Sequence, residues 1–357
     1  MSIIASNISD PHSPNAVRQP VRHLGKISDI AALWLPYMLE KKELPGDAET
    51  KRYTEEAMHL LGKDTVASSL ALFDSVMIER ALQHAGRPVP VVVEQLIKTV
   101  ADQLNCLPAL TYEHVIHSNP LQTDPRIFTE PKEGRGEFFF YSVHREIEAA
   151  LAETICKLRS ALLRSSSSDE AVCVLEGIEA LRGGMMQLIR ELPPKEFNRF
   201  RPFFNNDARN LPGPSGFFSA GVYVLDAYLT GSHPDMRAFL ALKAKSLQLY
   251  PATCAQQRFT GIMDIHNAHM SLHQRGDLLS EEYFPPKLRR RIASAMAEAR
   301  RAHFRLCKFF LPELFVDYEK TGTAQVSGVP TFLLKPIALY EQIAAMPLRS
   351  PTEKLET

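Results

Sequence analysis

The chain has 357 residues, of which 45% are hydrophobic and 23% are charged, as in an ordinary folded protein with one large domain or two modest ones. Its 41 basic residues balance its 41 acidic residues, so no global field attracts nucleic acid or an anionic membrane. No apolar run approaches the ~20 residues that cross a bilayer, and the first residues lack the order of a signal peptide. We therefore expect a cytosolic protein that acts on a small molecule.

The five cysteines, at positions 106, 156, 173, 254 and 307, are isolated and odd in number. None of them has CxxC spacing, which argues against a disulfide framework and against a zinc ribbon. A cysteine with a functional role must therefore act through chemistry other than a disulfide framework or a zinc ribbon.

The first residues predict a loose arm, followed by helices. Residues 1–22 are rich in Ser, Asn and Pro and could pack on a neighbouring subunit, which leaves a homodimer open. Residues 29–42, 53–86 and 91–105 have apolar side chains three and four positions apart, the period of an amphipathic helix. We therefore expect an all-α catalytic domain over 23–357, with a smaller helical subdomain at 23–120 as an option.

The middle of the chain predicts two long antiparallel helices. The first starts near Glu137 and ends at the serine run 165–168, and the second begins with the acidic residues Asp169 and Glu170. Residues 193–216 are dense in Pro, Asn and Gly, which favours a long irregular connection of the kind that often lines a site.

The last third predicts further helices. Residues 216–231 and the segments around 236–250 and 256–276 have helical patterns. Pro285 and Pro286 mark a helix start, and Pro312 should end that helix soon after Phe310. The stretch TGTAQVSGVPTF then predicts a loop, followed by a final helix from Lys335.

His303 and Cys307 stand four residues apart in HFRLC, so on a helix both leave the same face with Cβ atoms about 6 Å apart. An imidazole that binds iron and a thiol one turn further on would suit a haem with one thioether tether. The CxxCH signature of c-type cytochromes is absent. The same spacing also fits a partly buried histidine and a small apolar cysteine in a core helix.

His266, His269 and His273 fall at positions i, i+3 and i+7, along one stripe of the predicted helix. One interpretation is a distal wall above a haem, with a histidine that moves protons or binds iron. A zinc site built on the pair His269 and His273 is an alternative, although the HExxH base is missing. A solvated polar stripe remains the third interpretation.

Three further histidines are weaker candidates. His114 and His117 precede an Asn-Pro stop and could enter a pocket at a helix end, or lie on the surface. His144 stands alone on an apolar helix, where a hydrogen-bonded core histidine is more common than a ligand.

The order of several stretches resembles the haem-dependent aromatic oxygenases, a group that includes tryptophan and indoleamine dioxygenases and the ring-rearranging enzyme of pyrrolnitrin biosynthesis. These stretches are HVIHSNP, IFTEPKEGRGEFFFYSVHREIEAALAETICKL, RPFF, LPGPSGFFSAGVYVLDAYLTGS, RRAHFRL and the VSGVP loop. The resemblance implies a helical bundle that encloses a haem, with His303 as the proximal ligand.

Within this group, a proximal histidine followed four residues later by a haem-attaching cysteine is similar to the 3-methyl-L-tyrosine hydroxylases of the saframycin and safracin pathways. This implies a peroxide-using hydroxylase for 3-methyl-L-tyrosine or L-tyrosine, with one of His266, His269 and His273 on the distal side and His266 preferred by its separation from His303. Tryptophan dioxygenases hold their substrate with a GTGG-type loop, whereas this chain has TGTAQVSGVPTF. Ser327 in that loop and His117 are therefore the expected substrate contacts. A haem dioxygenase for an indole and a non-haem metal-binding protein remain alternatives.

Overall fold

The computed structural model describes residues 65–84, 86–104, 106–119, 126–129, 135–164, 167–204, 219–230, 284–315 and 329–346, with scattered residues between 46 and 58 and between 233 and 240. These residues are 86% helical and include no strand, which confirms the all-α prediction. No helix among them is long and apolar enough to cross a bilayer. The arm predicted at 1–22 lies outside the described residues.

The chain divides into two compact units. The first comprises residues 1–145, 192–220 and 245–263, and the second comprises residues 146–191, 221–244 and 264–357.

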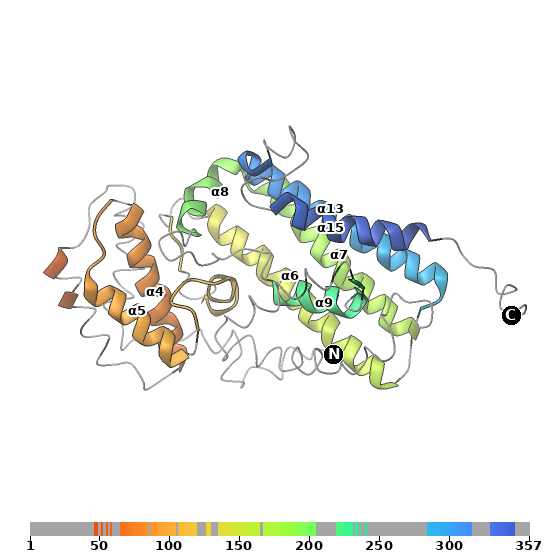
Figure 1. Ribbon diagram of the computed structural model, residues 1–357, viewed down its shortest axis with the longest axis horizontal. Coiled ribbons are helices and arrows are strands. Elements are labelled where there is room, and N and C mark those ends of the chain that lie inside the picture. The colour runs from red at the N-terminus through yellow and green to blue at the C-terminus, as the bar shows by residue number, and fades with distance from the viewer. Residues whose placement is uncertain are drawn as a thin grey trace, which may run out of the picture. The chain divides into compact units, whose positions relative to one another are not determined.

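In the first unit, helices α4 (Thr65–His84) and α5 (Val91–Leu104) lie side by side (Figure 1). Residues 70–82 of α4 are all buried, as expected for a helix in the centre of a unit. The turn that follows α4 passes through Gly86 at φ 69°, a left-handed conformation that costs glycine little because it has no Cβ atom. This turn lets α5 fold back along α4.

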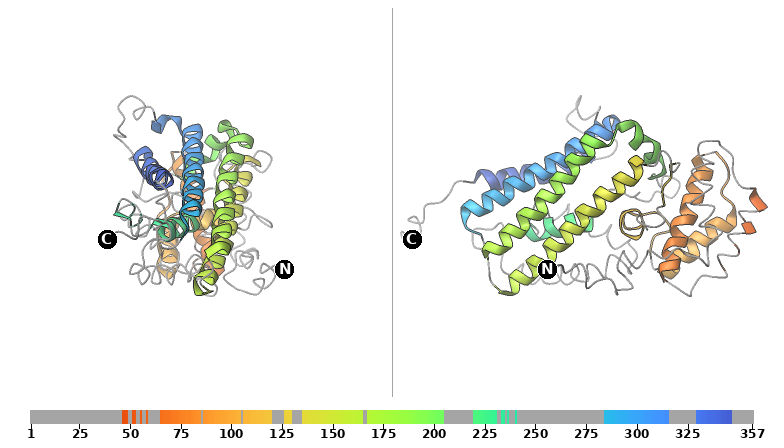
Figure 2. Two further views of the ribbon diagram at one scale, coloured as in Figure 1. Left: turned by 90° about the vertical axis from the view of Figure 1, so that its right-hand side faces the viewer. Right: turned by 180° about the vertical axis from the view of Figure 1, so that it is seen from behind.

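The two predicted long helices are present as α6 (Arg135–Arg164) and α7 (Ser167–Glu191). In the second unit, Thr154 of α6 lies directly against Gly177 of α7. A Cβ atom on Gly177 would come within 2.3 Å of Thr154 Oγ1, so only glycine allows this close approach. The two helices run alongside one another in both views of Figure 2.

The prediction of an irregular connection over 193–216 is wrong in its first half. Helix α8 (Pro194–Phe200) and the 3-10 helix η6 (Arg201–Phe204) occupy it. Pro194 fits the first turn of a helix, where its missing N–H is not needed. Buried aromatic residues then hold the segment in place against Phe140, and these are Phe197, Phe200 and Phe204.

The second unit also contains α9 (Ala220–Thr230) and the pair α13 (Pro286–Phe310) and α15 (Val329–Ala345). Helix α13 contacts both α7 and α15 (Figure 2). The predicted start and end of α13 are confirmed, since it begins after Pro285 and ends two residues before Pro312.

The loop predicted up to Phe332 is wrong at its end, because α15 starts at Val329 and includes Pro336 in its interior. Proline lacks the N–H that an interior helical position needs. Burial against the rest of the second unit offsets this loss, and the buried side chains are Ile337, Leu339, Tyr340 and Ile343. Tertiary packing therefore outweighs local propensity here.

Candidate functional site

Helix α13 carries both residues of the HFRLC motif in its last two turns. His303 and Cys307 are each partly exposed, whereas Leu306 and Phe310 beside them are buried. The helix is regular through both positions, so their Cβ atoms stand one turn apart, about 5–6 Å. The imidazole and the thiol therefore leave α13 at the border between its buried and exposed faces.

Small side chains form much of the buried face of α13. Four of its buried residues are alanines: Ala293, Ala297, Ala299 and Ala302. They allow neighbouring helices to approach closely, and α13 contacts α7 and α15. Next to His303, Phe304 packs edge-on against Phe315 of η9 (Pro312–Phe315), with ring centroids 5.3 Å apart. This contact fixes the path of the chain beyond the end of α13.

The residues on this face fit a singly tethered haem. Such a haem needs an axial imidazole at the iron and one thiol at the edge of the porphyrin. His303 and Cys307 supply both donors from consecutive turns, and neither is buried completely. Cys307 is not part of a disulfide. This donor set would hold a haem with one thioether.

A second group of functional side chains lies in the first unit, around the π-helix η5 (Glu113–Ser118). His114 and His117 on η5 are both buried, and π-helical turns are frequent at functional sites. The ring of Tyr112 packs edge-on against the rings of His117 and His144, with ring centroids 6.2 Å and 6.1 Å apart. His144 Nδ1 bonds a main-chain carbonyl one turn earlier, at 2.8 Å, as expected for a core histidine.

His114 is hydrogen-bonded through one of its two ring nitrogens. Its Nδ1 accepts a hydrogen bond from the N–H of Thr111 at 3.2 Å, so the neutral ring carries its proton on Nε2. That Nε2 is buried and has no hydrogen-bond partner. The sequence pointed to His117 as a substrate contact, and no periodic pattern distinguishes His114 from it. The side chains of His114 and His117 are both buried, with exposures of 0% and 3%, and this burial depends on the tertiary fold.

The buried histidines should make the stability of the protein depend on pH. Burial lowers the pKa of His114 and of His144 to about 4, whereas an unfolded histidine titrates near pH 6.5. The unfolded chain therefore binds protons first as the pH falls. The contribution of these groups is fully present above pH 6.5 and is lost between pH 6.5 and 4, by about 1.4 kcal/mol per pH unit for each histidine.

Urea-unfolding midpoints between pH 7 and pH 5 would measure this effect. We expect the double variant His114→Gln and His144→Gln to flatten the pH dependence over this range. An unchanged slope in the double variant would show that other groups cause the acid sensitivity.

Several predicted site residues cannot be placed from the structure. His266, His269, His273 and Ser327 all lie outside the described residues, and so does the pair of the zinc alternative. Within the part of the chain that the structure describes, no group of three or more His, Cys, Asp or Glu side chains could hold a metal ion.

Comparisons with known proteins assign no family. No protein-family model matches the chain, and a search of curated proteins finds no match either.

Proposed function

We propose that this chain is a haem-dependent hydroxylase that uses hydrogen peroxide to oxidise the aromatic ring of a tyrosine-like amino acid. The observation that supports the proposal is the position of His303 and Cys307 on one unbroken helix, one turn apart and both partly exposed. When bound, the haem supplies the redox chemistry of oxygen transfer, and the protein supplies binding, orientation and proton transfer.

His303 and Cys307 have separate tasks in this proposal. A ring nitrogen of His303 would hold the iron, and the Cys307 thiol would form a thioether by addition to one porphyrin vinyl group. In that addition an S–C and a C–H bond form while the S–H bond and the C=C π bond break, so no external oxidant is consumed. The thioether then prevents loss of the cofactor, because dissociation would require a covalent bond to break.

The proposed proton shuttle is His266 or His269, with His266 preferred by its separation from His303. Its neutral ring nitrogen accepts the proton of the near peroxide oxygen and returns it to the far oxygen, which leaves as water. Acid–base assistance of this kind typically contributes about 10²–10⁴ in rate.

The proposed substrate is 3-methyl-L-tyrosine, with L-tyrosine as the second choice, in the biosynthesis of a natural product. His117 and Ser327 are the proposed substrate contacts. The zero formal net charge fits a small substrate in the cytosol, with no nucleic acid or membrane as partner. A homodimer is the proposed assembly.

Labelled peroxide tests the reaction. The ferric protein, given H₂¹⁸O₂ and no reductase, should hydroxylate the ring and place ¹⁸O in the product. A product without label, or one formed only by the ferrous protein with O₂, would move the assignment to the dioxygenases. A purified protein without a Soret band would leave the non-haem metal-binding alternative.

A further inference from the structure

A buried network of charged and polar groups joins three helices of the second unit. Asp226 on α9 is completely buried, and its carboxylate accepts hydrogen bonds on both oxygens. Arg300 of α13 donates from Nη2 to Asp226 Oδ2, and the hydroxyl of Tyr340 on α15 donates to Asp226 Oδ1 at 3.1 Å. Thr230, one turn after Asp226, donates to the Asp226 main-chain carbonyl at 3.0 Å. One carboxylate therefore connects α9, α13 and α15.

Burial of the Arg300–Asp226 ion pair carries a free-energy cost. Arg300 and Asp226 have side-chain exposures of 6% and 0%, so both charges are removed from water. Burial lowers the pKa of Arg300 to about 10, and the guanidinium therefore remains charged at neutral pH. Its Nε is buried without a hydrogen-bond partner, which adds a further cost. Well-packed apolar side chains often stabilise a fold as well as a buried ion pair does. The presence of the Arg300–Asp226 pair is therefore better explained by a role in positioning the helices than by a role in stability.

Part of the buried face of α13 constrains the helix only weakly. Four of its ten buried residues are alanines, whose small side chains resist sliding or rotation of the helix less than large ones do. A hydrogen bond to a carboxylate is directional, and the one from Arg300 Nη2 to Asp226 Oδ2 limits the rotation and sliding of α13 relative to α9.

The position of Arg300 along α13 links this network to the candidate site. Arg300, His303 and Cys307 stand at i, i+3 and i+7, so their Cβ atoms follow one stripe of the helix. A rotation or a shift of α13 would move all three together. A displacement of about 1 Å can reduce the rate of an oriented reaction on the order of a hundredfold.

We propose that Asp226, Arg300 and Tyr340 are positioning residues that hold His303 and Cys307 in place for haem attachment. This inference rests on the proposed function. It assigns the network a role in forming the thioether and in setting the ligand field of His303, beyond its contribution to the fold.

The test compares Asp226→Asn and Tyr340→Phe with a matched control on the same helices. Asp226→Asn keeps the shape of the side chain and removes its charge, whereas Tyr340→Phe removes one hydroxyl. The control is Arg301→Gln, because the neighbouring Arg301 of α13 pairs with Glu341 of α15 on the surface, with exposures of 37% and 45%. Each purified holoprotein is measured for its covalently attached haem by denaturing intact mass, for its Soret maximum and for its helicity.

We expect Asp226→Asn to retain its helicity, to lose covalent haem on the order of tenfold, and to shift the Soret maximum of the haem that remains. Tyr340→Phe should show a smaller loss of covalent haem. If Asp226→Asn does not fold, the result for Tyr340→Phe alone tests the role of the network. Arg301→Gln should match the wild type.

Wild-type haem attachment and an unchanged Soret maximum in both network variants would overturn this inference alone. An equal loss in Arg301→Gln would also overturn it, because general loosening of α13 would then be the cause. A wild-type chain without covalent haem would overturn the tether of the proposed function and this inference with it.

Discussion

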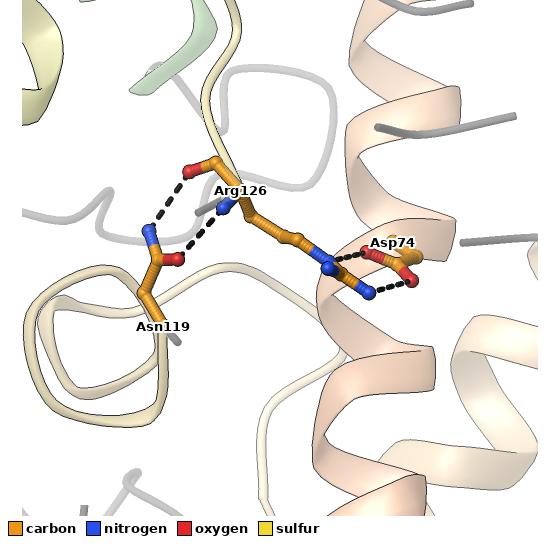
Figure 3. Close-up of polar contacts among 3 residues, drawn as sticks. All are labelled: Asp74, Asn119 and Arg126. Atoms are coloured by element: carbon orange, nitrogen blue, oxygen red, sulfur yellow. Dashed lines mark hydrogen bonds and ion pairs between the residues drawn. The ribbon is translucent and has the colours of Figure 1, made fainter. Parts of the chain in front are cut away.

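Replacement of Asp74 by alanine should lower the free energy of unfolding by about 3–5 kcal/mol, the usual cost of removing one partner from a buried ion pair. Asp74 on α4 accepts from Arg126 Nε at 2.9 Å and from Nη2 at 3.2 Å, and the two side chains are 1% and 0% exposed (Figure 3). Without the carboxylate, the buried guanidinium would lose the counter-charge that Asp74 provides. The urea-unfolding transition, followed by far-UV circular dichroism, measures the loss.

The main chain around Arg126 explains why the guanidinium cannot simply turn towards water. Asn119 donates from Nδ2 to the carbonyl of Arg126 and accepts the Arg126 N–H on Oδ1, both at 2.8 Å (Figure 3). This reciprocal pair holds the backbone of Arg126 in place while its side chain reaches Asp74.

Two further variants make the Asp74 prediction specific. Asp102→Asn should change the free energy of unfolding by less than about 1 kcal/mol, because its partner Lys98 is 73% exposed. The double variant Asp74→Leu and Arg126→Met should be more stable than Asp74→Ala, because it removes both charges of this buried pair. A loss in Asp74→Ala as small as that in Asp102→Asn would contradict this account of the ion pair.

Replacement of Cys307 by alanine should convert a haem that resists acid–acetone into one that is extracted completely. His303 would still bind iron in this variant, so the purified protein should keep a Soret band. His303→Ala removes the proposed axial ligand but keeps Cys307, so the haem attached in this variant should still resist extraction while its Soret maximum shifts. Haem content before and after extraction and the Soret maximum measure these effects.

The matched control for the tether is Cys156→Ala on α6, since Cys156 is exposed and stands outside the HFRLC motif. Its haem should remain resistant to extraction, as in the wild type. Complete extraction of haem from the wild-type protein would show that Cys307 forms no thioether.

Much of the fold follows from local sequence signals. The serine run between α6 and α7, the double proline before α13 and Pro312 after it mark helix ends because they act through the backbone of neighbouring residues. The start of α15 could not be found in this way. Its six residues before Lys335 resemble a loop, and burial of later residues such as Tyr340 determines that they are helical.

Local sequence signals likewise predict only part of the candidate site. The spacing of His303 and Cys307 on one helix is a local property and was visible in the sequence. The contacts of Arg300 with Asp226, and of Arg126 with Asp74, join residues 74 and 52 positions apart. No local pattern predicts such pairs, because they depend on which helices pack together. The burial of His114 on a π-helical turn has the same origin.

Intact mass of the wild-type protein under denaturing conditions tests the central claim most directly, because unfolding releases every haem that is not covalently bound. The account predicts a chain heavier by the mass of one haem, with the addition located on the peptide that contains Cys307. A chain with the mass of the polypeptide alone would contradict it.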